Sequence, residues 1–508
     1  MRPLEIVLVA GLAATMVARL IGKRWPWELG RWPAGALVAV LVLHLLIEGP
    51  RRPMSVAYLV VAIGALLALR SPRPVPERRS VVAALGRWAV GLLLLLLAAA
   101  PPWLLPVFEL PAPTGRFGVG STSFPLLDPA RTETLGARPG GPREFMVRVW
   151  YPAPKDADGP RAKYAEPPEV NGGILGLIRI GALMGDQLAY VKTHSLMDVP
   201  IAERAKPLPV LIFSHGYTGF TGQNTPQMEE LASRGYVIFS ISHTHDAGAT
   251  VFPDGRVIPL DPSILTMFQR SQAGMDSVTA AIAKLGNAAT PADRQAAFLA
   301  FADFNAPRIE ASVSVWSADT RYLLDHLERL GPDGSGGRFA GALDLEKVGI
   351  FGMSFGGSNA GEVCRVDPRC KAGINIDGQQ FGPLVERDSI TVPFMIMASN
   401  TALPLHRAAF DRLLGPAFLV QLKGTEHLAL TDTPLMAPLL LRWMGITGTM
   451  APERTEALMT AYLTAFFDRF LLDRPAQLLT LTAPDPDVSF AFKNLAQSGA
   501  GAGSGERQ

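Results

Sequence analysis

The residues best suited to chemistry lie in the segment GMSFGG, residues 352–357, which follows a strand-like run and precedes a stretch of helical character. A Gly-x-Ser-x-Gly pentapeptide in that setting predicts a nucleophile elbow, a sharp turn that presents the serine hydroxyl. The flanking residues must be glycine because side chains there would clash with neighbouring backbone. The pentapeptide alone is weak evidence in a chain with 49 glycines. Its position between strand and helix identifies Ser354 as the candidate nucleophile.

A serine nucleophile needs a general base to accept its proton. The candidate is His427, which ends the segment KGTEH just after the last predicted core strand. Of the eight histidines, only His427 lies beyond the serine at a strand end. His406 is the rival, but it precedes that strand.

The acid of the triad has two candidates. Asp377 closes the run 372–376, the first predicted strand after the serine. Many hydrolases with this elbow take the acid one strand later, where this chain has Ser399 and Asn400, and the next acid there is Asp411. We therefore prefer Asp377 as the acid of the triad, with Asp411 as the second choice. The role of this acid would be to hold the histidine tautomer and stabilise the imidazolium.

Backbone N–H groups must face the oxyanion that develops in the transition state. One donor is expected from Phe355, directly after the nucleophile. The second is expected from Tyr217, which follows Gly216 in the segment FSHGY at the end of an early strand. His215 is expected to brace this loop by hydrogen bonds.

The cluster His243, His245 and Asp246 contains metal-ligand residue types. Further ligands at matched spacing do not stand out, so the sequence predicts no metal site and no cofactor. The net charge of +2 gives no electrostatic case for nucleic acid. Oligomeric state is left open.

Apolar runs that alternate with helical stretches predict an α/β fold with a mainly parallel sheet. The predicted strands are Phe145–Tyr151, Val210–Ser214, Val237–Ser242, Val348–Gly352, Ala372–Ile376, Phe394–Ala398 and Phe418–Leu422, and the helices are Thr225–Arg234, Ala311–Leu330, Asn359–Val366 and Pro452–Leu472. Residues 253–255 (PDG) predict a hairpin turn. Residues 152–207 and 260–307 are expected to form cap-like insertions, within which residues 174–184 are apolar enough either for core or for contact with lipid or an acyl chain.

The first 105 residues predict a membrane region. Mean hydropathy of the whole chain is +0.21. A membrane span needs about 20 apolar residues, and four apolar stretches are candidates: Leu4–Ile21, Ala34–Ile47, Met54–Leu69 and Val81–Leu105. The expected parts are therefore residues 1–105 with about four transmembrane helices, a Pro/Gly-rich linker at 106–142, a catalytic domain at 143–480 and a flexible tail at 481–508.

Basic residues in the loops indicate the orientation. By the positive-inside rule, the first and third loops lie in the cytoplasm, so the catalytic domain is expected to be extracytoplasmic, in a periplasm-like space. These loops carry Arg19, Lys23, Arg24, Arg31, Arg70, Arg73, Arg78 and Arg79, whereas the second has only Arg51 and Arg52. Outside the cytoplasm Cys364 and Cys370 could form a disulfide; the alternative is two buried thiols.

Together these motifs resemble the plasma type of platelet-activating factor acetylhydrolase and its bacterial relatives, within the α/β-hydrolase superfamily. The matching segments are FSHGY (213–217), residues 235–243, GMSFGG (352–357), AGINIDG (372–378) and GTEH (424–427). The resemblance favours Asp377 over Asp411 and assigns the oxyanion donors to Tyr217 and Phe355. It departs at Met353, where animal members carry histidine, and in the membrane region, which animal members lack.

The resemblance implies a serine hydrolase that cleaves carboxylic esters through an acyl-enzyme, with short-acyl, platelet-activating-factor-like phospholipids or other lipid esters as substrates. Alternatives are an acyltransferase with the same triad, a polyester hydrolase or general carboxylesterase, and a catalytically silent membrane receptor. The presence of all three triad candidates, Ser354, Asp377 and His427, disfavours the receptor. The partner expected is a small-molecule or lipid ester.

Overall fold

The computed structural model describes residues 1–20, 27–69, 81–136, 139–165, 170, 185, 187–273, 280, 283–302, 307–330, 337–380, 384, 388–480, 485–495 and 505–507. The chain divides into two compact units. The first comprises Met1–Phe108, Ile180–Val191 and Met436–Leu440, and the second comprises the remaining residues. The predicted apolar segment 174–184 lies outside the described residues, as do Lys23, Arg24, Arg70, Arg73, Arg78 and Arg79 of the charged loops.

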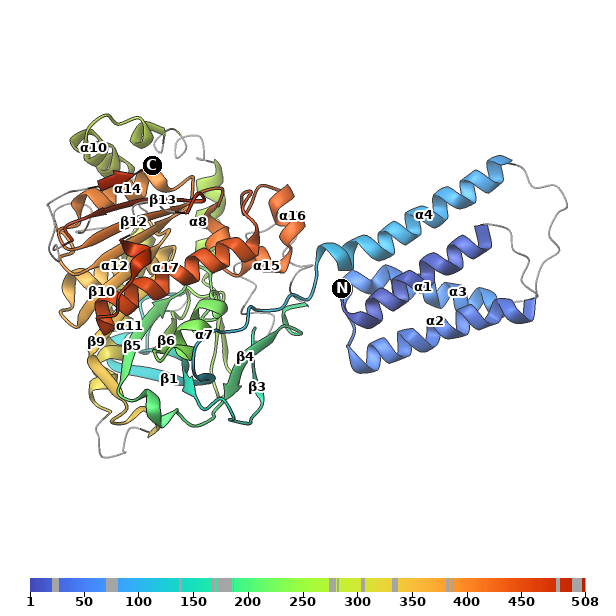
Figure 1. Ribbon diagram of the computed structural model, residues 1–508, viewed down its shortest axis with the longest axis horizontal. Helices are drawn as coiled ribbons and strands as arrows, with labels where there is room; N and C mark the ends of the chain where they lie inside the picture. The colour runs from blue at the N-terminus through green and yellow to red at the C-terminus, as the bar shows by residue number, and fades with distance from the viewer. Residues whose placement is uncertain are drawn as a thin grey trace. The chain divides into compact units, whose positions relative to one another are not determined.

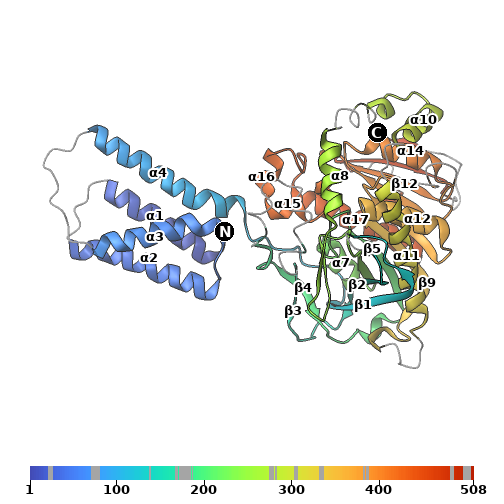
Figure 2. The same ribbon diagram turned by 180° about the vertical axis from the view of Figure 1, so that it is seen from behind.

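Four long helices form the first unit, as Figures 1 and 2 show. They are α1 (Pro3–Leu20), α2 (Trp27–Ile47), α3 (Ser55–Leu69) and α4 (Val81–Leu104), and η1 (Arg52–Met54) precedes α3. The four predicted apolar stretches are therefore helical. Two segments, Arg52–Leu69 and Leu85–Leu104, are long and apolar enough to cross a membrane by length and composition, while Pro3–Ala18 and Trp32–Ile47 are shorter apolar helices.

A buried polar network joins the helices at one end of this bundle. The Arg51 guanidinium donates to both carboxylate oxygens of Glu5, at 2.8 and 3.0 Å. His44 lies 2.9 Å from the Glu48 carboxylate and 2.7 Å from the Tyr58 hydroxyl. Because buried charges are costly unless they are paired, this network fixes how α1, α2 and α3 meet.

A twelve-stranded sheet forms the core of the second unit, in the order β14-β13-β12-β11-β10-β9-β5-β6-β2-β1-β4-β3. The strands from β12 to β6 run parallel to their neighbours, whereas β2 and β13 on either side are antiparallel. Their bounds are β1 (Gly118–Thr132), β2 (Pro142–Ala153), β3 (Arg161–Lys163), β4 (Lys192–Met197), β5 (Leu208–Ser214), β6 (Val237–Ser242), β9 (Leu343–Met353), β10 (Cys370–Ile376), β11 (Phe394–Ala398), β12 (Ala417–Leu422), β13 (Val488–Lys493) and β14 (Gly505–Arg507). All seven predicted strands are present.

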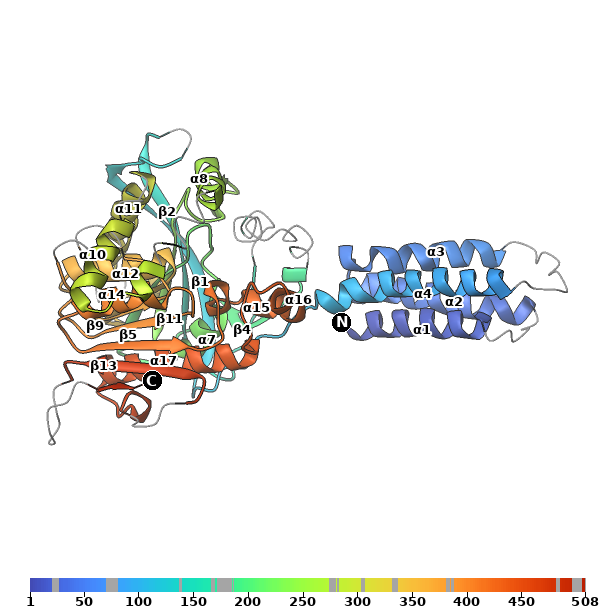
Figure 3. The ribbon, with the colours of Figure 1, turned by 90° about the horizontal axis from the view of Figure 1, so that it is seen from above.

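Helices cover both faces of the sheet, as the view in Figure 3 shows. One core cluster packs α7 (Thr225–Ser233) and α17 (Pro452–Leu472) on one face. The other packs α11 (Pro307–Glu328), α12 (Phe355–Val366) and α14 (Leu403–Arg412) on the opposite face. The central strands are buried on both sides, which explains their unbroken apolar sequences. The remaining elements are β7 (Ala249–Val251), β8 (Val257–Pro259), α8 (Pro262–Ala273), α10 (Pro291–Ala302), α15 (Thr433–Met436), α16 (Pro438–Trp443), η2 (Glu203–Ala205), η3 (Gly337–Phe339), η4 (His427–Leu430) and η5 (Gln477–Leu479).

Two predicted domain boundaries are wrong, and one predicted insertion is only partly a cap. The expected linker 106–142 contains β1, which pairs along its length with β2 and belongs to the sheet. The expected tail 481–508 contains β13, which pairs with β12. The first insertion, 152–207, contributes β3 and β4 to the sheet edge and so is not purely a cap. Because β1 contains two prolines and β4 is largely polar, each carries a weak strand signal, and pairing with other strands decides them.

The predicted hairpin at 253–255 is confirmed, because β7 and β8 pair antiparallel on either side of it. The two cysteines form a disulfide, with Cα atoms 5.1 Å apart. Cys364 lies in α12 and Cys370 begins β10, so the bridge ties the helix that follows the nucleophile to the strand that leads to Asp377. The alternative of two free thiols is therefore excluded in this structure.

Candidate active site

Ser354 occupies a sharp turn between β9 and α12, as the elbow motif predicts. Its backbone has φ 54° and ψ −121°, a strained conformation for a residue with a side chain. A Cβ atom at Gly352 would lie 2.3 Å from the backbone of Gly356, and one at Gly356 would lie 1.9 Å from the Ser214 carbonyl oxygen. Only glycine fits at these two positions, which is the steric reason for the motif.

A continuous chain of hydrogen bonds joins the three predicted triad residues. The Ser354 Oγ lies 2.9 Å from Nε2 of His427. The other ring nitrogen of His427, Nδ1, lies 2.7 Å from Oδ2 of Asp377. The elements that present them are the β9–α12 turn, the end of β10 and the loop after β12, which meet at the carboxyl edge of the parallel strands.

Asp377 is a buried carboxylate with an unusual number of donors. Its Oδ1 accepts from the Ser399 amide at 2.7 Å and from His406 Nε2 at 3.0 Å, and its Oδ2 accepts from the Ser399 hydroxyl at 2.8 Å as well as from His427. Burial alone would raise its pKa, but the hydrogen bonds and charges of His406 and His427 hold the pKa far below the usual range. Asp377 is therefore ionised at neutral pH.

The two rival residues have other positions. Asp411 lies near the end of α14 and pairs with Arg294 of α10 at 2.8 Å, and no hydrogen bond links it to His427 in the described part of the chain. His406 contacts Asp377 but not the serine. Sequence reasoning therefore missed Ser399 and His406 as partners of the acid; the one available signal was that Ser399 occupies the position one strand later, where an acid was sought.

The loop predicted to supply Tyr217 is held by buried histidines. His215 Nδ1 donates to the Gly216 carbonyl at 2.7 Å, and its Nε2 accepts from the His243 amide at 3.3 Å. Burial, followed by the proximity of His243, lowers the pKa of His215 to about 3, so the ring is neutral and can both donate and accept. The predicted bracing role of His215 is thus present in the structure. Gly216 approaches the nucleophile closely, because a Cβ there would lie 3.3 Å from the Ser354 Cβ.

His243 anchors the strand end beneath this loop. Its Nδ1 lies 3.0 Å from Asp319 and its Nε2 lies 3.1 Å from the Ser214 hydroxyl. Burial lowers the pKa of His243 to about 4, although the hydrogen bond with Asp319 opposes the shift. Asp319 is in turn held by Arg143 at 2.7 Å. This arrangement has the residue types of a second triad, but all of its side chains are buried, so its role is structural.

The possible metal cluster is accounted for by protein contacts. His243 is occupied as described, and Asp246 accepts from Arg308 at 2.5 Å and from the Trp316 indole at 2.8 Å. Within the residues that the structure describes, the one group of side chains close enough to share a metal ion is Glu5, His44 and Glu48 in the helical bundle. There Arg2 and Arg51 already bind the Glu5 carboxylate.

Helix α8 of the second insertion and helix α11, which follows it, pack against Tyr217 and Phe355. Ile264 of α8 and Trp316 of α11 form an apolar cluster with Tyr217 and Phe355. The Tyr217 hydroxyl lies 2.9 Å from the Ser312 hydroxyl of α11. Helices α8 and α11 therefore hold the two residues that are expected to supply oxyanion N–H groups.

Comparisons with known proteins agree with the predicted resemblance. The family described as "Platelet-activating factor acetylhydrolase, isoform II" matches residues 106–260. A platelet-activating factor acetylhydrolase from Cavia porcellus is 23% identical over 342 residues, which cover 64% of this chain and 72% of that protein. A solved ferulic acid esterase from Streptomyces cinnamoneus has a TM-score of 0.57 and 26% identity, and the match covers 76% of this chain and 99% of the esterase. The predicted resemblance is confirmed.

The chain is accordingly a serine ester hydrolase that acts on carboxylic esters, with an α/β-hydrolase fold. It is similar both to a platelet-activating factor acetylhydrolase and to a ferulic acid esterase.

Proposed function

We propose that Ser354, His427 and Asp377 form the catalytic triad of this ester hydrolase. The observation that carries the proposal is the unbroken hydrogen-bond chain from the serine hydroxyl through both imidazole nitrogens to a buried carboxylate. Asp377 keeps the proton of His427 on Nδ1, so Nε2 is free to accept the serine proton. This is the arrangement that activates a serine at neutral pH.

The reaction runs through an acyl-enzyme. Ser354 Oγ attacks the ester carbonyl carbon while its proton passes to His427 Nε2, and the imidazolium then protonates the departing alcohol oxygen. Water then attacks the acyl-enzyme carbonyl as His427 takes its proton, and His427 returns that proton to Ser354 Oγ as the C–O bond breaks and the carboxylic acid leaves. In both steps the backbone N–H groups of Tyr217 and Phe355 stabilise the negative oxygen.

The substrate class that we propose is short-acyl lipid esters, of which platelet-activating-factor-like phospholipids are one kind. The similarity to an acetylhydrolase supports the short acyl group. The exposure of the His427 side chain, 46%, supports a substrate whose bulk stays outside the protein. The esterase relative supports a second candidate, a general carboxylesterase that accepts aromatic acyl groups.

A substrate profile separates these candidates. We expect kcat/KM to fall steeply as the acyl group of a nitrophenyl ester is lengthened from acetyl to decanoyl, and acetylated phospholipid to be cleaved faster than methyl ferulate. A higher kcat/KM for methyl ferulate would favour the second candidate. Product analysis with added alcohol would detect acyl transfer, because an alcohol can replace water in the second step.

We also propose that the four N-terminal helices anchor the enzyme in a membrane, with the catalytic unit on the extracytoplasmic side. Large apolar side chains lie exposed along these helices, among them Leu46 (78%), Val82 (78%) and Leu69 (73%). A soluble protein rarely exposes so much apolar surface. The Cys364–Cys370 disulfide supports an oxidising compartment.

A reporter fused after Gln508 tests this topology. We expect an alkaline phosphatase fusion to be active and a fluorescent protein that matures only in the cytoplasm to be dark. Thiol counting on the denatured, unreduced chain should find no free thiol, because both cysteines are in the bridge. The opposite reporter pattern would overturn the orientation, and recovery of the enzyme without detergent would overturn the membrane anchor.

A further inference from the structure

A second histidine, His406, contacts the acid of the triad. It lies in α14, and its side chain is buried, with 2% of its surface exposed. Its Nε2 lies 3.0 Å from Oδ1 of Asp377, while His427 binds the other oxygen, Oδ2. Since an ionised carboxylate can only accept, Nε2 of His406 carries a proton and donates it.

The position of His406 gives it influence over the base. Asp377 has a left-handed backbone with φ 56°, an unfavourable conformation for a residue with a side chain. The hydrogen bonds of its carboxylate therefore help to fix the position of its side chain. The two histidines share one carboxylate. A hydrogen bond from His406 partly neutralises the Asp377 carboxylate, and this weakens the stabilisation that the carboxylate gives to the imidazolium form of His427.

We propose that His406 is a positioning residue that fixes the Asp377 carboxylate and sets the basicity of His427. This inference rests on the triad proposed above and deepens it. Ser399 holds the same carboxylate through its amide and hydroxyl, and besides His427 the remaining donor among the described residues is His406, from a separate element, α14.

Other charged groups around α14 have different partners. Arg407, Asp411 and Arg412 lie on the helix itself. Asp411 pairs with Arg294 of α10 and accepts through its backbone from Lys493 of β13, and Arg412 donates to the Leu384 carbonyl at 3.3 Å. Glu426, next to the base, accepts from Thr401 at 2.6 Å. Within the described residues, His406 and His427 are thus the titratable side chains that hydrogen bond to Asp377.

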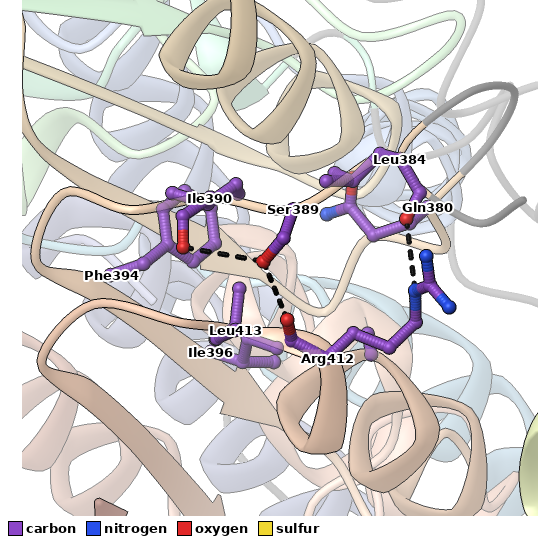
Figure 4. Close-up of a pocket in the computed structure, with 9 residues that line it drawn as sticks. Gln380, Leu384, Ser389, Ile390, Phe394, Ile396, Arg412 and Leu413 are labelled. Carbon is purple, nitrogen blue, oxygen red and sulfur yellow. Dashed lines mark hydrogen bonds between the residues drawn. The ribbon is translucent and has the colours of Figure 1, made fainter. Parts of the chain in front are cut away.

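The far end of α14 is anchored independently of the triad. A small pocket lies between this helix and β11, lined by Gln380, Leu384, Ser389, Ile390, Phe394, Ile396, Ala409, Arg412 and Leu413 (Figure 4). The Ser389 hydroxyl at its centre donates to the Arg412 carbonyl at 2.5 Å. The change Ser389→Ala therefore loosens the helix and leaves the Asp377 donors in place.

The experiment compares His406→Leu, which removes the donor, with His406→Gln, which retains an N–H group. We expect His406→Leu to lower kcat about 10–100-fold with KM little changed, because Asp377 loses a hydrogen bond that orients its carboxylate toward His427. The acidic limb of the kcat/KM profile should move to higher pH by about half a unit or more, because the less neutralised carboxylate favours the imidazolium of His427. His406→Gln should restore most of kcat and the position of the limb.

Ser389→Ala is the matched packing control, and we expect it to leave the acidic limb where it is. An unmoved limb in His406→Leu, or an equal shift in Ser389→Ala, would overturn the proposal. If His406→Leu is too unstable to assay, the acidic limb of His406→Gln is compared with that of His406→Asn. Asparagine is too short to reach Asp377, so a limb that differs between these two variants would support the proposal. Should Ser354→Ala remain active, the triad itself fails, which is a separate outcome from a normal pH profile in His406→Leu.

Discussion

Replacement of Ser354 by alanine is expected to lower kcat about a million-fold and to abolish covalent labelling by a fluorophosphonate. The hydroxyl lies 2.9 Å from Nε2 of His427 and is the atom that would form the acyl-enzyme. Any residual rate would come from substrate binding and the oxyanion donors, which contribute about 10³–10⁴-fold over water in a comparable enzyme. Hydrolysis of a nitrophenyl ester and gel-based detection of the labelled protein measure both effects.

The matched control is Ser263→Ala, because Ser263 is an exposed serine at the start of α8 with no contact to the triad. It should retain full activity and labelling. Turnover by Ser354→Ala at the wild-type rate would remove Ser354 from the mechanism.

Replacement of Asp377 by asparagine is expected to lower kcat about 10³–10⁴-fold. The amide cannot stabilise the imidazolium, and its NH₂ group would favour the tautomer of His427 with the proton on Nε2. That tautomer cannot accept the serine proton. The loss should appear in kcat more than in KM, because the interaction strengthens as His427 becomes charged.

The change Asp411→Asn provides the comparison. Asp411 forms a partly exposed ion pair with Arg294, and such pairs contribute about 1 kcal/mol or less to stability. Its kcat should therefore remain within about twofold of the wild type. Equal losses in the two variants, measured with a saturating nitrophenyl ester, would exclude Asp377 as the acid of the triad.

The sequence by itself determined the parts of this protein whose signal is local. The elbow is recognisable because steric contact leaves only glycine at positions such as Gly356, which lies against the Ser214 carbonyl. The core strands are recognisable because a strand buried on both faces is apolar throughout, as in Phe394–Ala398. His427 could be predicted since the chain places it directly after the last parallel strand.

The tertiary structure alone decided what depends on distant partners. The strand Gly118–Thr132 begins in a Pro/Gly-rich region and is a strand because β2 pairs with it. The position of Asp377 at the end of a predicted strand favoured it over Asp411, but only the meeting of β10 with the loop after β12 joins Asp377 to His427.

His406 shows the same limit most clearly. In the sequence it is a histidine before the last strand and therefore a poor base, yet the packing of α14 brings its ring to within 3.0 Å of the acid. A local pattern reports the conformation of its own segment, but a hydrogen bond between side chains 29 residues apart forms only when the fold closes.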